Sequence, residues 1–502
     1  MFIRKRHNAS GSTSIQIVHK LGSTLRVIKH VGTASSDEQI NLLKAKAEKI
    51  LMQSTLSLFN AHTSSLEDIH ISRSILVGFQ EVFGTIYDEI GYSALLEDPL
   101  LKDLVVARIA KPNSKLATFR WLKEKLGRSI EKDQIYRFMD TLDENIERTI
   151  TDHTFAFTKK LLKETINIIF FDATTLHFET FQSDKFRKTG FSKVGKHNQP
   201  QIVIGLMVTT GGFPIGYDVY PGNEFDGHTI RSALRRVSRR YDVKDVVFVA
   251  DNAMMSTDNV KIIEKANFKF IMAARIKSMN KFYKDQFLDE SNYKKNILDI
   301  PYGRHRLVVS YSPDRARKDK LDREKNLEQI RKRLTKRSKI TKSKLGKIGK
   351  SKYLSVDGEA EVAINYSAVR ADEAWDGLKG YMTNISKEEL SSEEIISKYS
   401  DLWQVEKAFK VSKSDLQIRP IYHFKRERIK AHVLIVFMSL VVSRLTELKL
   451  KQKGITVKRL VELLENDSLI EIHNPKTGEK ILRRTPLSDT LKEIYSILKI
   501  SW

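Results

Sequence analysis

The sequence has no cysteine among its 502 residues. Disulfide bonds, cysteine-ligated zinc and thiol catalysis are therefore excluded, and the composition suits a reducing cytoplasm. The first residues lack the apolar core of a signal peptide. The longest apolar stretch, residues 433–442, is interrupted by Ser439 and is far shorter than the roughly 20 residues of a membrane span. We therefore expect a buried helix there and no membrane partner.

Acidic residues are scarce relative to basic ones, with 62 Asp and Glu against 87 Lys and Arg, a net charge of +25. Such an excess attracts polyanions and suits a nucleic-acid-binding protein. A ribosome-associated or membrane-surface protein is the alternative that the composition leaves open. Hydrophobic residues make up 41% of the chain, which is enough for a sizeable core, and the length suits about three domains.

Two apolar segments lead into aspartates. Residues 166–171 precede Asp172, and residues 246–250 precede Asp251. Near-continuous apolar runs are typical of strands buried on both faces, as in a parallel pair. If the strands lie side by side, two carboxylates approach each other, and their repulsion favours a cation between them. Oxygen ligands without His or Cys favour Mg²⁺ or Mn²⁺, so the pattern indicates metal-dependent phosphoryl transfer. A lone aspartate in this position is more often a turn or cap residue.

A third carboxylate interrupts a helical pattern further along the chain. A Ser-Ser-Glu-Glu capping box predicts the start of a helix, and Glu406 lies between Leu402 and Phe409 on the apolar stripe of that helix. A buried carboxylate needs a proton, a cationic partner or a metal ion. The structural alternative is that the Glu406 carboxylate pairs with Lys413 or Arg419. The presence of the two aspartates favours a metal ion instead.

The order of patterns predicts an α/β fold: an RNase H-like catalytic core with a β-rich insertion, preceded by a mainly helical N-terminal region. Between Arg315 and Lys352 there are 17 Lys or Arg against 4 Asp or Glu. This run indicates either a nucleic-acid contact or a solvated face. The expected segments are a basic β-hairpin at 1–33, a helical DNA-binding region at 34–160, the first part of the core at 161–280, a β-rich basic insertion at 281–384, the core helix with the catalytic glutamate at 385–450, and a C-terminal helical region at 451–502.

Asp172, Asp251 and Glu406 resemble the DDE triad of bacterial insertion-sequence transposases with an RNase H-like core. Further segments are similar to the subgroup typified by "insertion sequence sixteen-thirty-four", and together they span nearly the whole chain. Those segments include Gly190-Phe191-Ser192-Lys193, Pro200-Gln201-Ile202-Val203-Ile204-Gly205-Leu206, Pro221-Gly222-Asn223 and Ala250-Asp251-Asn252-Ala253-Met254-Met255-Ser256.

The segment around the glutamate is similar to the signature Tyr-x2-Arg-x3-Glu-x6-Lys of the "insertion sequence four" superfamily. Tyr399, Glu406 and Lys413 match it, and Leu402 stands where the signature has arginine. The resemblance implies a DNA transposase that cuts and joins strands at the ends of its own insertion sequence. It implies two Mg²⁺ ions, with Mn²⁺ as a substitute, held by the three carboxylates.

The implied partners are double-stranded DNA, as terminal inverted repeats and target, and a second copy of the chain in a homodimer on DNA. The implied location is a bacterial cytoplasm, associated with the nucleoid. Two rivals stay open: an RNase H-like nuclease without strand transfer, and a non-catalytic DNA-binding derivative of a transposase.

Five further residues are expected near DNA. Lys413 would meet a backbone phosphate, and Tyr399 would support the phosphate or the metal shell by hydrogen bonding. Lys193 and Lys196 lie in a glycine-flanked loop and would either contact DNA or be solvated. For Trp403, core packing is favoured over stacking on an unpaired base.

Overall fold

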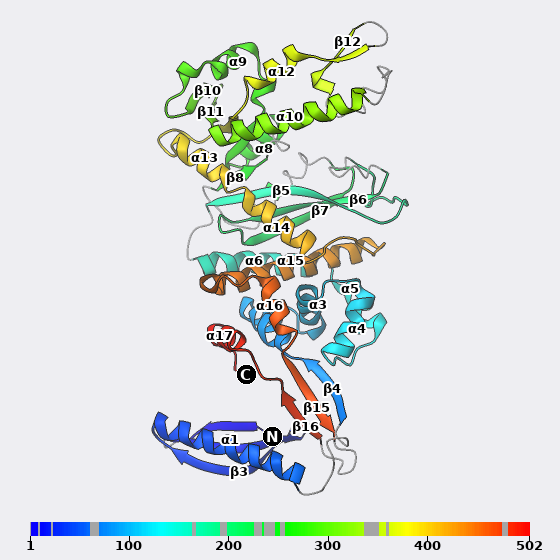
Figure 1. Cartoon of the computed structure of the whole chain (residues 1–502), viewed down its shortest axis with the longest axis vertical. Coiled ribbons are helices and arrows are strands. Elements are labelled where there is room, and N and C mark those ends of the chain that lie inside the picture. Colours follow the sequence, from blue (N-terminus) through cyan, green and yellow to red (C-terminus); the bar gives the residue numbers. More distant parts are fainter. Residues whose placement is uncertain are drawn as a thin grey trace. The chain divides into compact units, whose positions relative to one another are not determined.

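The computed structural model describes residues 2–8, 11–21, 24–60, 70–162, 167–190, 198–224, 233–234, 246–251, 257–335, 351–357, 361–473 and 480–501. The chain forms two compact units (Figure 1). The first comprises Met1–Ile86, Lys115–Lys132 and Thr446–Trp502, and the second comprises Tyr87–Ser114 and Asp133–Leu445.

The second unit is built on an eight-stranded sheet with the order β10-β11-β14-β9-β8-β5-β6-β7. Within it, β5, β6 and β7 are antiparallel neighbours, while β8 runs parallel to both β5 and β9. This is the strand order of an RNase H-like core, so the predicted fold class is confirmed. The strands are β5 (Ile168–His177), β6 (Gln201–Val208), β7 (Pro214–Pro221), β8 (Val247–Ala250), β9 (Lys269–Ala274), β10 (Ile297–Tyr302), β11 (His305–Tyr311) and β14 (Leu378–Thr383).

Residues 281–384 do not form a separate β-rich subdomain. Their strands β10, β11 and β14 continue the central sheet beyond β9. Among the strands that the structure describes in this segment, only β12 (Leu354–Asp357) and β13 (Glu361–Ile364) pair by themselves. The basic run of this segment begins in α10 (Pro313–Thr335), and residues 336–350 of that run lie outside the described residues. The alternation of residues along a strand shows which side chains share a face, but not which sheet the strand joins. The sequence therefore could not show that these strands extend the central sheet.

Helices cover the sheet on both faces. In Figure 1, α14 (Trp403–Ser414) lies across β5 and β6. By length and composition α15 (Arg426–Lys449) could cross a membrane, but 89% of its apolar window is buried, as expected of a core helix. The other helices lying wholly or mostly in this unit are α2 (Thr85–Ile90), α3 (Pro99–Ala110), α5 (Lys132–Thr141), α6 (Glu144–Leu162), α8 (Thr257–Lys265), α9 (Lys281–Leu288), α12 (Tyr366–Glu373) and α13 (Ser392–Ser400).

The first unit contains two small antiparallel sheets. The expected hairpin at 1–33 is a three-stranded sheet of β1 (Phe2–His7), β2 (Thr13–Leu21) and β3 (Thr24–Ala34), packed on α1 (Asp37–Asn60). In the second, β4 (His70–Leu76) pairs with β15 (Ser468–His473), which also pairs with β16 (Lys480–Arg484). The C-terminal region is therefore not purely helical. The unit also holds α4 (Lys115–Lys125), α16 (Val457–Leu464) and α17 (Asp489–Ile497).

Arg306 on β11 fastens the loop that leads into α13. Its Nη1 donates to the backbone carbonyls of Ile385, Ser386 and Leu390 at 2.9, 2.8 and 2.9 Å, and its Nη2 donates to Asp299 at 2.7 Å. Only 12% of the Arg306 side chain and 11% of the Asp299 side chain are exposed. The guanidinium therefore fixes the position at which α13 begins. The chain runs from α13 toward Glu406.

We predict that Arg306→Ala lowers the free energy of unfolding by about 2–4 kcal/mol, because three carbonyls lose a donor and a mostly buried carboxylate loses its arginine partner. Arg304→Ala is the matched control: the Arg304 side chain is 72% exposed and reaches Glu264 at 3.3 Å, so its effect should stay within about 0.5 kcal/mol. Urea unfolding of both variants measures this, and equal losses would show that the loop does not depend on Arg306.

Candidate functional site

The two aspartates lie on neighbouring parallel strands. Phe171 on β5 pairs with Ala250 on β8, so the next residues, Asp172 and Asp251, lie beside each other one step further along. Neighbouring strands are about 4.8 Å apart. β5 does not end at Asp172 as expected but continues to His177, paired there with β6 alone. The pairing of the two aspartate-bearing strands is thus as predicted, and only the strand end is misplaced.

Alternation along β5 and β8 decides which way these carboxylates face. Ile169, Phe171 and Ala173 belong to one core cluster together with Phe248 and Ala250. Because successive strand residues point to opposite faces, Asp172 lies on the other face of the sheet. The helix α14 covers that face, because Lys413 on α14 donates a hydrogen bond to Thr174, which lies on the same side of β5 as Asp172. The Oδ1 atom of half-buried Asp172 accepts the backbone N–H of Ala173 at 2.8 Å.

The third carboxylate, Glu406, follows a break in the helix that the sequence predicts. The structure has two helices, α13 and α14, where the sequence predicts one, and the chain turns tightly at Asp401 and Leu402. The N–H of Gln404 donates to the carbonyl of Asp401 at 2.9 Å, a three-residue spacing that shifts the helical phase. Leu402 is consequently buried and Glu406 exposed. The prediction that Glu406 is buried is therefore wrong.

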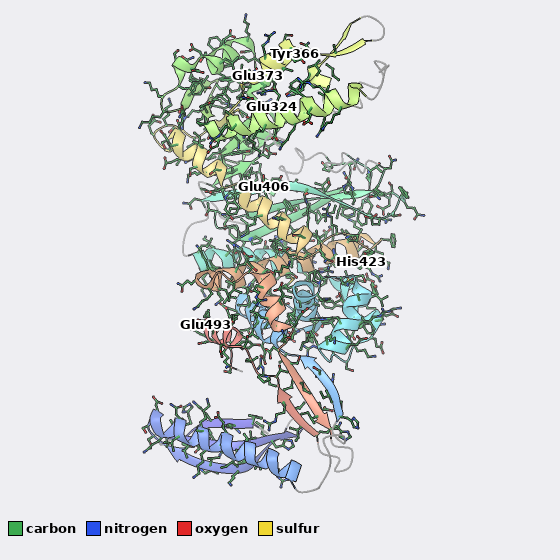
Figure 2. The ribbon with its side chains drawn as sticks, in the orientation of Figure 1. Glu324, Tyr366, Glu373, Glu406, His423 and Glu493 are labelled. Atoms are coloured by element: carbon green, nitrogen blue, oxygen red, sulfur yellow. The ribbon has the colours of Figure 1, made fainter. Side chains whose placement is uncertain are left out.

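Asp251 and Glu406 line one cavity of about 680 Å³. Figure 2 labels Glu406 on α14, beside the central sheet. Four cationic side chains line the same cavity, so two carboxylates are outnumbered two to one by positive charges. These cations are Arg275, Lys277, Arg315 and Lys379.

Lys379 is the most enclosed of these four cations. Its Nζ lies 4.3 Å from the centre of the Tyr399 ring, within the range of a cation–π contact. Burial lowers the pKa of Lys379, and the nearby Arg315 lowers it further, whereas the Asp251 and Glu406 carboxylates oppose this shift. No motif in the sequence selects Lys379; its place becomes evident only when β14 joins the central sheet.

Tyr399 connects α13 to the acidic end of β8. Its hydroxyl donates to Oδ1 of Asp251 at 3.4 Å, and its ring packs edge-on against Tyr381 with centroids 5.0 Å apart. Burial raises the pKa of Tyr399, and the Asp251 carboxylate adds to this shift. The hydroxyl therefore stays protonated and acts as a donor to the Asp251 carboxylate.

The remaining predicted residues divide into three cases. The Lys413 ammonium is hydrogen-bonded to the hydroxyl of Thr174, two residues beyond Asp172 on the same strand face. Trp403 is 50% exposed and lines the cavity, so the preference for core packing is wrong. Lys193 and Lys196 lie outside the described residues.

The helical region before the core also contains two basic residues that cannot serve as an outer contact surface. Arg108 is 3% exposed and Lys115 is 4% exposed. Burial lowers the pKa of Arg108 to about 10. The basic side chains between residues 108 and 125, within the region expected to bind DNA, therefore include core positions as well as solvated ones.

The site contains oxygen ligands that suit a metal ion, but they are not arranged as a complete coordination shell. Within the described ranges, no three His, Cys, Asp or Glu side chains are grouped to hold an ion. Asp251 and Glu406 nevertheless share one cavity, and the strand register brings Asp172 beside Asp251. Carboxylate oxygens are the ligands that Mg²⁺ and Mn²⁺ prefer. The residues fit a hard divalent cation, and binding requires the carboxylates to turn toward one another.

Residues 163–442 match the model of the transposase DDE domain family. No curated protein matches the chain. Solved structures similar to it include the piggyBac transposase synaptic complex with hairpin DNA, at 10% identity and a TM-score of 0.41, covering 77% of this chain and 76% of that one. The Mos1 transposase paired-end complex with left transposon end aligns at 14% identity and a TM-score of 0.16, covering 37% of this chain and 57% of that one.

We predict that Mn²⁺ raises the melting temperature of the chain and that Asp251→Asn removes this effect. An ion at 100 times its dissociation constant stabilises the folded state by about 2.7 kcal/mol. Asp258→Asn is the control, because Asp258 is exposed on α8 and should keep the full shift. A Mn²⁺-dependent shift that survives in Asp251→Asn would place the ion elsewhere.

Proposed function

We propose a specific activity for this chain, which belongs to the transposase DDE domain family: it cuts DNA at the ends of its own mobile element and joins those ends to new DNA. The observation that carries the proposal is the cavity that Asp251 and Glu406 share with four cations. Carboxylates suit a metal-dependent phosphoryl transfer, and the cations suit the phosphates of the substrate.

DDE transposases generally use divalent metal ions, and we propose Mg²⁺, with Mn²⁺ as a substitute, as the ions used here. Asp172, Asp251 and Glu406 would hold two of them. When bound, such ions activate the attacking oxygen and stabilise the leaving oxygen. The same residues serve cutting and joining, because only the attacking oxygen changes from water to a 3′-hydroxyl.

Lys379 and Arg315 orient the DNA backbone relative to the carboxylates. Lys379 lies against the Tyr399 ring and is attracted electrostatically by the carboxylates of Asp251 and Glu406. A phosphate in the cavity would therefore bring its negative charge to an ammonium that is already partly desolvated, where electrostatic attraction is stronger than in water. Arg315, 45% exposed, forms the outer part of this cationic lining.

Trp403 adds an aromatic surface at the same place. Half of it is exposed, and it begins α14 three residues before Glu406. An unpaired base next to the cut site could stack on the indole, an interaction worth about 1–3 kcal/mol per base. Stacking thus replaces core packing as the role that we propose for Trp403.

We further propose that the chain belongs to the "insertion sequence four" superfamily and the subgroup typified by "insertion sequence sixteen-thirty-four", acting in a bacterial cytoplasm on nucleoid DNA. The matches at Tyr399, Glu406 and Lys413 support this. The substrates would be terminal inverted repeats and target DNA, held by a homodimer. A nuclease that cuts without joining is the competing function, and a strand-transfer assay separates the two.

We predict that Asp172→Asn, Asp251→Asn and Glu406→Gln each reduce Mg²⁺-dependent cleavage and strand transfer by at least about 10³-fold. Binding of end DNA should change little, because the cationic lining remains. Asp258→Asn serves as the isosteric control. Nicking of labelled duplexes and gel-shift affinity measure the two properties, and near wild-type cleavage by any one of the three variants would exclude that residue from the site.

A second prediction concerns Lys379. Lys379→Ala should reduce cleavage by about 10²-fold, since it removes a preorganised cation next to the reacting phosphate, while Lys379→Arg keeps the charge and most of the activity. Lys277→Ala is the matched control: Lys277 lines the same cavity, but Asp372 holds its ammonium at 2.7 Å. If both alanine variants lose activity equally, Lys379 contributes only to the general positive potential.

A further inference from the structure

The N-terminal sheet has a charge pattern that the catalytic site does not explain. The first acidic residue of the chain is Asp37, and the 36 residues before it contain six Lys or Arg and three His. These residues form β1, β2 and β3. The module is therefore cationic throughout its strands, whereas the cavity around Glu406 mixes both signs of charge.

One face of this sheet is occupied by α1. Ile15 and Ile17 on β2 are buried in a cluster with Ala47, and Ile3 and Leu43 pack against that cluster. Because strand side chains alternate between faces, the residues between these belong to the opposite face.

The opposite face carries arginine, imidazole, hydroxyl and apolar groups side by side. Arg4 pairs with Gln16 and Arg6 with Ser14 across β1 and β2, and Gln16 pairs with His30 on β3. Arg4, Arg6 and His30 are all exposed. At one end of the face, Phe2 and Val27 are 46% and 48% exposed.

Hydrogen bonds order the polar part of this face. The Ser14 and Thr33 hydroxyls lie 2.9 Å apart, and the Thr33 hydroxyl lies 3.2 Å from Nε2 of His30. The Asn8 amide donates to the Ser14 hydroxyl at 2.9 Å. Polar groups held in fixed positions lose less conformational entropy on binding a partner.

We propose that this open face, defined by Phe2, Arg4, Arg6, Gln16, Val27 and His30, docks into a groove of double-stranded DNA and reads its sequence. Three strands span about 10 Å between the outer backbones, and the major groove of B-DNA is about 12 Å wide. Arginine suits guanine edges, glutamine suits adenine, and apolar side chains suit the thymine methyl group. Charge alone would serve non-specific binding, but this mixture suits base readout.

The inference rests on the proposed function only for the origin of the DNA, which would be the ends of the element. It assigns sequence recognition to the sheet of β1, β2 and β3, and catalysis to the cavity lined by Asp251 and Glu406. The helical region at 34–160, expected from the sequence to bind DNA, is then not the principal reader.

The test is a pair of double variants of the full chain. Arg4→Ala/Arg6→Ala removes two charges from the open face, and Lys5→Ala/Lys29→Ala removes two exposed charges from the same sheet at positions that alternate to the α1 side. The probe is a duplex enriched by the wild-type chain from a random-sequence library, beside a scrambled duplex. Binding is measured in EDTA, so the result does not depend on catalysis.

We expect the open-face variant to lose about 10- to 100-fold in affinity for the enriched duplex and to approach the wild-type affinity for the scrambled one. The control variant should lose much less. Arg4→Lys/Arg6→Lys should keep the salt dependence of binding but lose much of the sequence preference, because lysine lacks the bidentate fork. Circular dichroism and melting confirm that the variants remain folded.

Equal losses in the open-face and control variants would reduce the effect to net charge and overturn the proposal, as would unchanged affinity in the open-face variant. Tighter binding to an RNA duplex of the same sequence, lost in the open-face variant, would assign the face to RNA and also overturn it. Glu406→Gln, measured in parallel, separates the two ideas: cleavage by that variant bears on the proposed chemistry and not on the sheet.

Discussion

The parallel pairing of β5 with β8 is the constraint on which the site depends. It places Asp172 and Asp251 beside each other on one face of the sheet, and two like charges at strand spacing repel unless cations or hydrogen-bond donors lie near them. The surrounding elements supply these groups. Tyr399 donates to Asp251 from α13, and Lys379 approaches from β14. The extension of the sheet through β14 is thus part of the site as well as part of the fold.

Leu402 stands where the signature of the proposed superfamily has arginine, and its surroundings suit an apolar residue. Leu402 is 6% exposed at the turn between α13 and α14, and an arginine held there without a partner would be costly. The cavity instead receives cations from other elements: Arg275 after β9, Arg315 from α10 and Lys379 from β14. Positive charge near the carboxylates is therefore kept even though the helix that carries Glu406 lacks the signature arginine.

The sequence was sufficient for the features that follow from local period and chemistry. The apolar runs before Asp172 and Asp251 identify the buried parallel strands, and these strands lie side by side as expected. The phase of Glu406 was not predictable, because it depends on a tight turn at Asp401 that no single residue marks. Lys379 was missed for another reason. The surroundings of a lysine in a short strand cannot be predicted until the neighbouring strands are known, and these are distant in sequence.

Catalysis and recognition place opposite demands on charge, and the two proposals assign them to different segments of the sequence. A two-metal site needs carboxylates, which repel the DNA backbone, so cations must lie near them, and four cations line the cavity with Asp251 and Glu406. A surface that reads DNA gains from the absence of carboxylates, and the strands before Asp37 contain none. These strands can then add to the long-range attraction of DNA without taking part in the chemistry. The proposed division allows affinity for DNA ends to vary without altering the three carboxylates on which cutting and joining would depend.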